Sequence, residues 1–126
     1  MTKEAEEKFI NTYIDEGYRA RLIKELGKRE RRTDALSRFF HGAEKLFNKS
    51  KSILRIKDID EINRSDDPVY LISWDKNDGI YMSFSEAAEH IRNSYMSIIL
   101  IGNRFAIVKE EVENGQPVIY YLKDKD

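Results

Sequence analysis

A chain of 126 residues has the size of a single domain, and residues 1–126 are expected to form one. The absence of cysteine excludes a disulfide framework, a thiolate metal site and a cysteine nucleophile. The net charge of −1 is distributed unevenly, because residues 1–18 carry −3, residues 19–57 carry +9 and residues 58–126 carry −7. Such segregation hints at a nucleic-acid or acidic partner, although an acidic half can also neutralise a basic half within one fold.

The apolar runs are too short for a membrane-spanning helix. Runs such as Ile98–Ile101 fall far short of the roughly 20 residues that cross a bilayer. The N-terminal residues MTKEAEEKF are acidic and lack the apolar core of a secretory signal. We therefore expect a cytoplasmic protein that has no membrane partner.

Helical periodicity governs the first part of the chain, and helices are predicted at about residues 3–16, 18–28 and 33–48. Gly17 ends the first helix and Gly27 loosens the second. The second helix is expected to bury Tyr18, Leu22, Ile23 and Leu26. The third has the most regular apolar stripe, with Phe40 near its middle; its members are Leu36, Phe39, Phe40, Ala43, Leu46 and Phe47. Whether the second and third helices are one kinked helix is left open.

Residues 48–68 are compatible with two structures. Ile53, Leu54 and Ile56 fit the start of a strand, whereas Ile59 and Ile62 fit a short helix.

The rest of the chain has strand-like patterns interrupted by one helix. Strands are predicted at Val69–Trp74, Ile80–Ser83, Ser97–Ile101, Arg104–Val112 and Val118–Lys123. Residues 75–79, DKNDG, have the composition of a turn, and Gly102-Asn103 and Asn114-Gly115 are typical of two-residue hairpins. Ser83 and Glu86 form a capping box, which predicts a helix from Phe84 to about Asn93.

This order of elements predicts an α+β domain. Its helical part, about residues 1–65, is expected to pack on one face of an antiparallel sheet, formed by residues 66–126 in the order ββαβββ.

The motifs that would indicate an enzyme are missing. The sequence contains no Gly-rich phosphate loop, no G-x-S-x-G elbow and no H-E-x-x-H helix, and its two histidines are too few for a histidine-rich metal centre. Asp75 to Glu86 resembles a calcium loop in length, but the position that requires a turn glycine is Ile80. No catalytic residue, metal site or cofactor is predicted.

One helical face carries a concentration of positive charge. If the third helix is continuous, its polar ridge lies within about 80° of arc and nearly opposite the apolar stripe; the ridge comprises Arg31, Asp34, Arg38, His41, Lys45 and Lys49. The run KRERR at residues 28–32 adds more cations just upstream. A solvated face usually mixes charges of both signs, whereas this one is mostly basic. The predicted binding residues are Lys28, Arg29, Arg31, Arg32, Arg38, His41, Lys45 and Lys49.

These residues favour a non-catalytic binding or regulatory domain that engages a polyanion, most plausibly nucleic acid, because arginine pairs bidentately with phosphate. A protein-interaction module is the first alternative, as a small inhibitor, immunity-type or adaptor protein. An enzyme built around His41 and nearby arginines is the second. A surface that is merely solvated would give the same sequence pattern.

Overall fold

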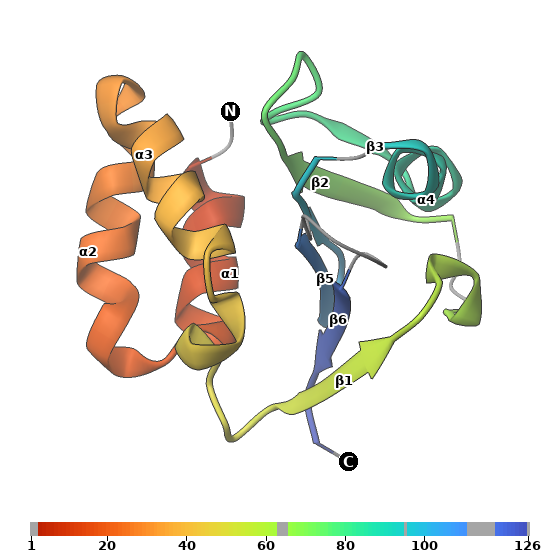
Figure 1. Cartoon of the computed structure of the whole chain (residues 1–126), viewed down its shortest axis with the longest axis horizontal. Helices are drawn as coiled ribbons and strands as arrows, with labels where there is room; N and C mark the ends of the chain where they lie inside the picture. Colours follow the sequence, from red (N-terminus) through yellow and green to blue (C-terminus); the bar gives the residue numbers. More distant parts are fainter. Residues whose placement is uncertain (1–2, 63–65, 95, 111–117, 126) are drawn as a thin grey trace.

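The computed structural model describes residues 3–62, 66–94, 96–110 and 118–125, and its chain begins with a layer of helices (Figure 1). These are α1 (Lys3–Tyr13), α2 (Glu16–Leu26), α3 (Arg29–Phe40) and the short 3-10 helix η1 (Ala43–Leu46). The side chain of Asp15 caps α2 by accepting a hydrogen bond from the Gly17 N–H at 3.0 Å. Two residues separate α2 from α3, so the second and third helices are distinct and form a helical hairpin.

The third helix is shorter than its apolar period predicts. It begins at Arg29 rather than residue 33 and ends at Phe40 rather than residue 48. Gly42 adopts a φ of 127°, which side chains rarely tolerate, and the chain turns there into η1. The apolar pattern continued across this break because Ala43 and Phe47 are buried by the turned chain rather than by a continuing helix.

The remaining elements confirm the α+β class. They are β1 (Ser52–Ile56), η2 (Ile59–Glu61), β2 (Pro68–Ile72), β3 (Tyr81–Ser83), α4 (Phe84–Asn93), β4 (Ile98–Ile101), β5 (Phe105–Glu110) and β6 (Val118–Lys123). Both structures considered for residues 48–68 occur, since β1 is followed by η2. The strands pair antiparallel in the order β1-β6-β5-β4-β2-β3, so β1 adds an edge strand to the predicted ββαβββ order.

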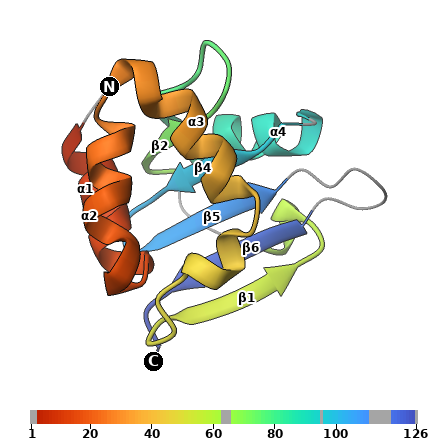
Figure 2. The ribbon, with the colours of Figure 1, turned by 60° about the vertical axis from the view of Figure 1, so that its left-hand side comes forward.

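Helices cover both faces of the sheet, which corrects the prediction of a single covered face (Figures 1 and 2). Successive residues of a strand point to opposite faces. Tyr70 and Ile72 therefore join the core beneath α1–α3, whereas Val69 and Leu71 join a second core beneath α4. The same alternation in β5 places Val108 on the first side. The uninterrupted apolar runs of β2, β4 and β5 reflect this burial from both sides.

A buried ion network ties the helical layer to the sheet. Arg32 is only 6% exposed. Its guanidinium donates to both carboxylate oxygens of Glu6 at 2.7 and 2.9 Å and to both of Asp78 at 2.8 Å each. Tyr70 donates its hydroxyl to Glu6 at 2.5 Å. We name Glu6, Arg32, Tyr70 and Asp78 the Arg32 network; it joins α1, α3, β2 and the β2–β3 loop.

The predicted turns are confirmed in part. The DKNDG segment does connect β2 to β3, and the Ser83–Glu86 cap does begin α4. The β4–β5 turn lies one residue later than predicted: Gly102 donates to the Phe105 carbonyl, and the central residues are Asn103 and Arg104, with a φ of 67° at Arg104. The predicted Asn114-Gly115 turn falls outside the described residues.

No helix in the described part of the chain has both the length and the apolar character needed to cross a membrane.

Candidate functional site

The break after α3 divides the predicted binding residues into three groups. Arg32 points inward and pairs with Glu6 and Asp78, so it does not lie on the exposed helical face where the sequence placed it. His41, Lys45 and Lys49 follow the end of α3 and do not continue its polar ridge. Lys28, Arg31 and Arg38 remain exposed on one side of the helical hairpin. Arg29 is also exposed but lies outside the two hollows described next.

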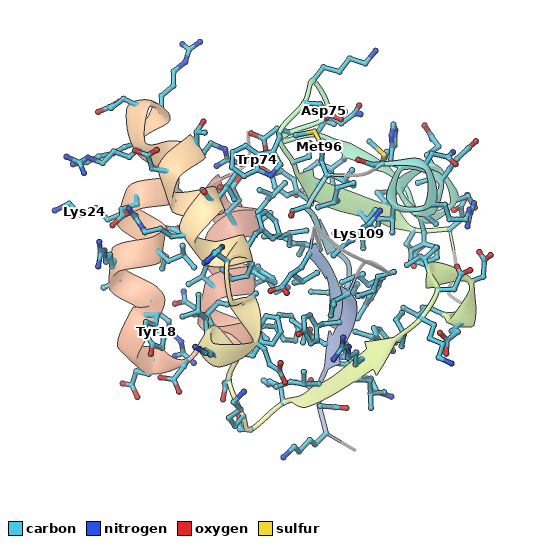
Figure 3. The ribbon with its side chains drawn as sticks, in the orientation of Figure 1. Tyr18, Lys24, Trp74, Asp75, Met96 and Lys109 are labelled. Atoms are coloured by element: carbon cyan, nitrogen blue, oxygen red, sulfur yellow. The ribbon has the colours of Figure 1, made fainter. Side chains whose placement is uncertain are left out.

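The hairpin carries a hollow in which positive charge is concentrated. We name it the basic groove; its volume is about 450 Å³ and it is lined by Ala20, Arg21, Lys24, Glu25, Lys28 and Arg31. Lys24, Lys28 and Arg31 form no ion pair with any residue that the structure describes. Figure 3 shows Lys24 extending from α2 away from the rest of the molecule. Four cations thus share the groove with one carboxylate.

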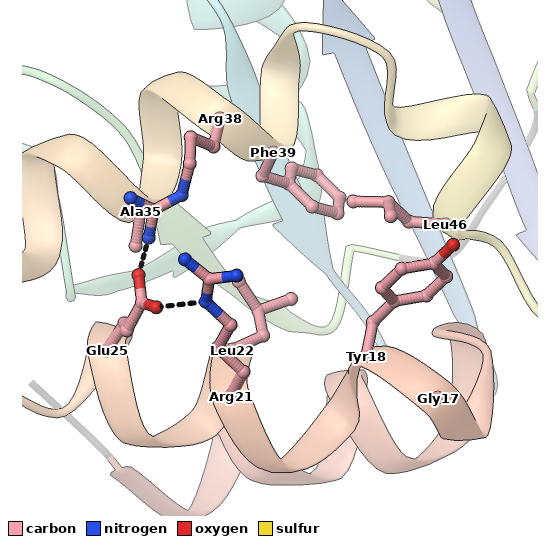
Figure 4. Close-up of a pocket in the computed structure, with 9 residues that line it drawn as sticks. All are labelled: Gly17, Tyr18, Arg21, Leu22, Glu25, Ala35, Arg38, Phe39 and Leu46. Atoms are coloured by element: carbon pink, nitrogen blue, oxygen red, sulfur yellow. Dashed lines mark hydrogen bonds and ion pairs between the residues drawn. The ribbon is translucent and has the colours of Figure 1, made fainter.

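A second hollow adjoins the basic groove and is mainly apolar. We name it the apolar pocket; its volume is about 380 Å³ and its lining is Gly17, Tyr18, Arg21, Leu22, Glu25, Ala35, Arg38, Phe39 and Leu46. Arg21 and Glu25 line both hollows. Figure 4 shows Tyr18, Phe39 and Leu46 on one side of the pocket and the charged side chains on the other.

Glu25 orders the two arginines at the junction of the hollows. Its side chain is 12% exposed and accepts from Arg21 Nε at 2.6 Å, and its other oxygen pairs with Arg38. Each guanidinium has five N–H donors in a planar fork, so both arginines keep donors for an external anion. Because one carboxylate neutralises only one of the two, the junction retains positive charge.

No protein-family model matches this chain, and no match was found among curated proteins or solved structures. The chemistry of its own side chains therefore supplies the functional argument.

Three residues of the two hollows were not predicted to bind a ligand: Tyr18, Arg21 and Lys24. Tyr18 was predicted to be buried, but it is 47% exposed at the apolar pocket. For Tyr18 and Arg21, the sequence did contain a signal. Tyr18, Arg21 and Glu25 follow a spacing of three and four residues, which places them on one face of α2.

A third, acidic hollow is formed by α4 and the β2–β3 loop. Its lining consists of Asp75, Glu86, Glu89, His90, Asn93 and Ser94. Burial tends to raise the pKa of Asp75, but hydrogen bonds from the Asn77 N–H and the Ser73 hydroxyl outweigh it, and the pKa is lowered. Among the described residues, no group of three His, Asp or Glu side chains is arranged to hold a metal ion.

An active site built around His41 would require both a nearby acid with a shifted pKa and a concave pocket lined by the histidine. Burial raises the pKa of the nearby Glu110, although its carboxylate accepts from the Ala43 N–H at 2.8 Å. Burial also raises the pKa of Tyr120 to about 12. His41 itself is exposed at the end of α3 and lines none of the hollows described above. A perturbed acid is therefore present without a concave site around the histidine.

Lys109 is a buried cation with a structural explanation. Its ammonium group donates to the Ile91 carbonyl at 2.5 Å and to the Ser94 carbonyl, at the end of α4. Burial lowers the pKa of Lys109. A lysine that donates to the last carbonyls of a helix caps it, and the partial negative charge of that helix end favours the cation.

Proposed function

We propose that this chain is a non-catalytic, cytoplasmic binding domain whose α2–α3 hairpin binds nucleic acid through the sugar–phosphate backbone. The observation that supports the proposal is the gathering of Arg21, Lys24, Lys28 and Arg31 around one hollow, with Arg38 beside it. The sequence predicted Lys28, Arg31 and Arg38 as binding residues. The fold adds Arg21 and Lys24, which lie on the facing helix α2.

Phosphate is the anion that this arrangement suits best. Arginine can donate two parallel hydrogen bonds to a phosphate, and lysine supplies a flexible point charge. Arg21 and Lys24 lie nearly one turn apart on α2, about 4.5 Å at 1.5 Å per residue, and Lys28 and Arg31 add two cations at the start of α3. Such a series of cations suits a repeating anion better than a single small one. Such contacts fix the position of a nucleic acid without reading its sequence.

Salt dependence provides the test. Fluorescence anisotropy would measure binding of labelled DNA of about 20 nucleotides, single-stranded and duplex, from ~50 to ~200 mM salt. Five cations opposed by one carboxylate are expected to neutralise about four phosphates. This predicts a log–log slope near −3 for a single strand and near −3.5 for a duplex.

A matched pair of triple variants isolates the groove. The variant K24Q/K28Q/R31Q is expected to bind more weakly and to reduce the steepness of the slope by roughly 2 for a single strand and about 2.7 for a duplex, since each lost contact accounts for 0.7–0.9. The control K57Q/K76Q/K125Q removes the same charge from exposed lysines outside the groove and is expected to keep the slope. Equal losses in both variants would mean that only net charge matters. No binding by the parent at ~50 mM salt would overturn the proposal and favour the protein-interaction alternative.

A further inference from the structure

We infer that the hairpin prefers single-stranded nucleic acid, because the apolar pocket receives one unpaired base, which stacks on Tyr18 while Arg21 and Arg38 hold the neighbouring phosphate. This inference rests on the proposed function and specifies the class of nucleic acid that the same site would take. It follows from the position of the apolar pocket beside the basic groove, with two residues common to both.

The apolar pocket combines the two features by which proteins hold a base. Proteins that bind single strands join a positive groove along the backbone to aromatic side chains on which bases stack. Tyr18 is 47% exposed, whereas Phe39 is buried by edge-on packing against Phe9 and Phe47. Phe39 and Leu46 thus form an apolar wall, and the Tyr18 ring is the aromatic surface that a ligand can reach (Figure 4).

The size of the pocket also suits a base. A volume of about 380 Å³ is near the lower end of the 300–1,000 Å³ typical of small-molecule sites. A base in a duplex is stacked and paired, and it would have to be unstacked and unpaired before it could enter. An unpaired base avoids most of that cost, and the pocket therefore discriminates against duplexes.

The length of α2 indicates how many nucleotides the site could hold. From Tyr18 to Leu26, its last residue, α2 rises about 12 Å at 1.5 Å per residue. At the ~3.4 Å spacing of a stacked strand, this corresponds to roughly four nucleotides. One nucleotide would place its base in the apolar pocket, and the next phosphates would lie along Lys24, Lys28 and Arg31.

The test compares oligonucleotides that differ only in their bases. Fluorescence anisotropy at constant salt would measure binding of a labelled thymidine decamer, an abasic decamer with the same phosphates, and a duplex decamer. The thymidine strand is expected to bind about 5-fold to 150-fold more tightly than the abasic strand, the range for one stacked base. Tyr18→Ala should lower thymidine binding to the abasic level and leave abasic binding unchanged.

Two further variants show that the aromatic ring at this position is responsible. Tyr18→Phe keeps the stacking surface and should keep the preference for thymidine over abasic strands. Tyr81→Ala removes another exposed tyrosine, which lies on β3 and lines neither hollow, and should also keep this preference. Circular dichroism checks that each variant is folded.

The outcomes separate this inference from the function on which it depends. Equal binding of thymidine and abasic strands, with the salt slope intact, would overturn the base pocket and leave the phosphate groove standing. Tighter binding of the duplex would likewise overturn the inference. Failure of all three probes to bind would remove the proposed function together with the base pocket.

Discussion

Arg31 and Arg32 are consecutive residues on α3, but they belong to opposite sides of the helical layer. Arg32 points toward the sheet, where Glu6 and Asp78 surround its guanidinium. Burial by itself would lower the pKa of Arg32, but hydrogen bonds and charge from the two carboxylates more than compensate, and the pKa is raised. Arg31 lines the basic groove and pairs with no described residue. In a helix, one residue in three or four faces inward. A run of basic residues in the sequence therefore overstates the positive charge that is exposed to a partner.

The largest expected difference is between substitutions at these two neighbours. Arg32→Met leaves the buried carboxylate of Glu6 and the partly buried carboxylate of Asp78 without their cation, and it is expected to lower the free energy of unfolding by about 3–5 kcal/mol. Arg31→Met alters an exposed side chain and is expected to change it by no more than about 0.5 kcal/mol. Urea unfolding followed by circular dichroism measures both. Similar values for the two variants would show that the Arg32 network does not stabilise the fold.

A smaller difference in stability is expected between substitutions at the neighbours Phe39 and Phe40, which are buried to different degrees in the same core. Phe39 is 2% exposed and contacts three aromatic rings, whereas Phe40 is half-buried at the margin of the same core. Phe39→Ala is expected to cost about 3–5 kcal/mol of unfolding free energy. Phe40→Ala should cost less, about 1–2 kcal/mol, because only part of its ring leaves water. The same urea titration checks the order, and a reversed order would place the apolar stripe where the sequence alone put it.

A small effect on stability is expected from Arg38, an exposed arginine that shares its carboxylate partner with Arg21. The side chain of Arg38 is 53% exposed in its ion pair with Glu25. If Arg38 were removed, Arg21 would still pair with Glu25. Arg38→Gln should therefore change the free energy of unfolding by less than about 1 kcal/mol. It should nevertheless weaken nucleic-acid binding, because Arg38 lies where the proposed phosphate contact is made. A stability loss above about 2 kcal/mol would mean that the Arg38 pair behaves like the buried pair of Arg32.

The sequence predicted those parts of the fold that depend on local chemistry. The Ser83 cap placed α4 correctly because its hydrogen bonds lie within one turn. The end of α3 was missed because Gly42 stops the helix through its backbone, while the apolar period continues past it. The second covered face was missed as well. Runs such as Ile98–Ile101, apolar at every position, were the available sign that the sheet is buried on both sides.

The candidate site was harder to predict because it is made by two facing helices. Lys28, Arg31 and Arg38 could be found on one helical face, but the partner face of α2 depends on how the hairpin closes. The inward direction of Arg32 could not be inferred from nearby residues. Its partner Asp78 is 46 residues away in the sequence. That segment was correctly predicted to form a turn, but no ion pair to the helices was predicted for it.

The Arg32 network also bears on the order in which the chain can acquire structure during synthesis. Its three charged members are residues 6, 32 and 78, so the ribosome delivers the last carboxylate well after the helices have emerged. Until then Glu6 is the only carboxylate of this network that Arg32 can pair with, and the apolar side of the hairpin has no sheet to cover it. We expect a nascent chain that stops before Asp78 to be digested readily by proteases and one that contains all six strands to resist them. The hairpin that carries the basic groove would thus take its final shape late, after the acidic half of the chain has been made.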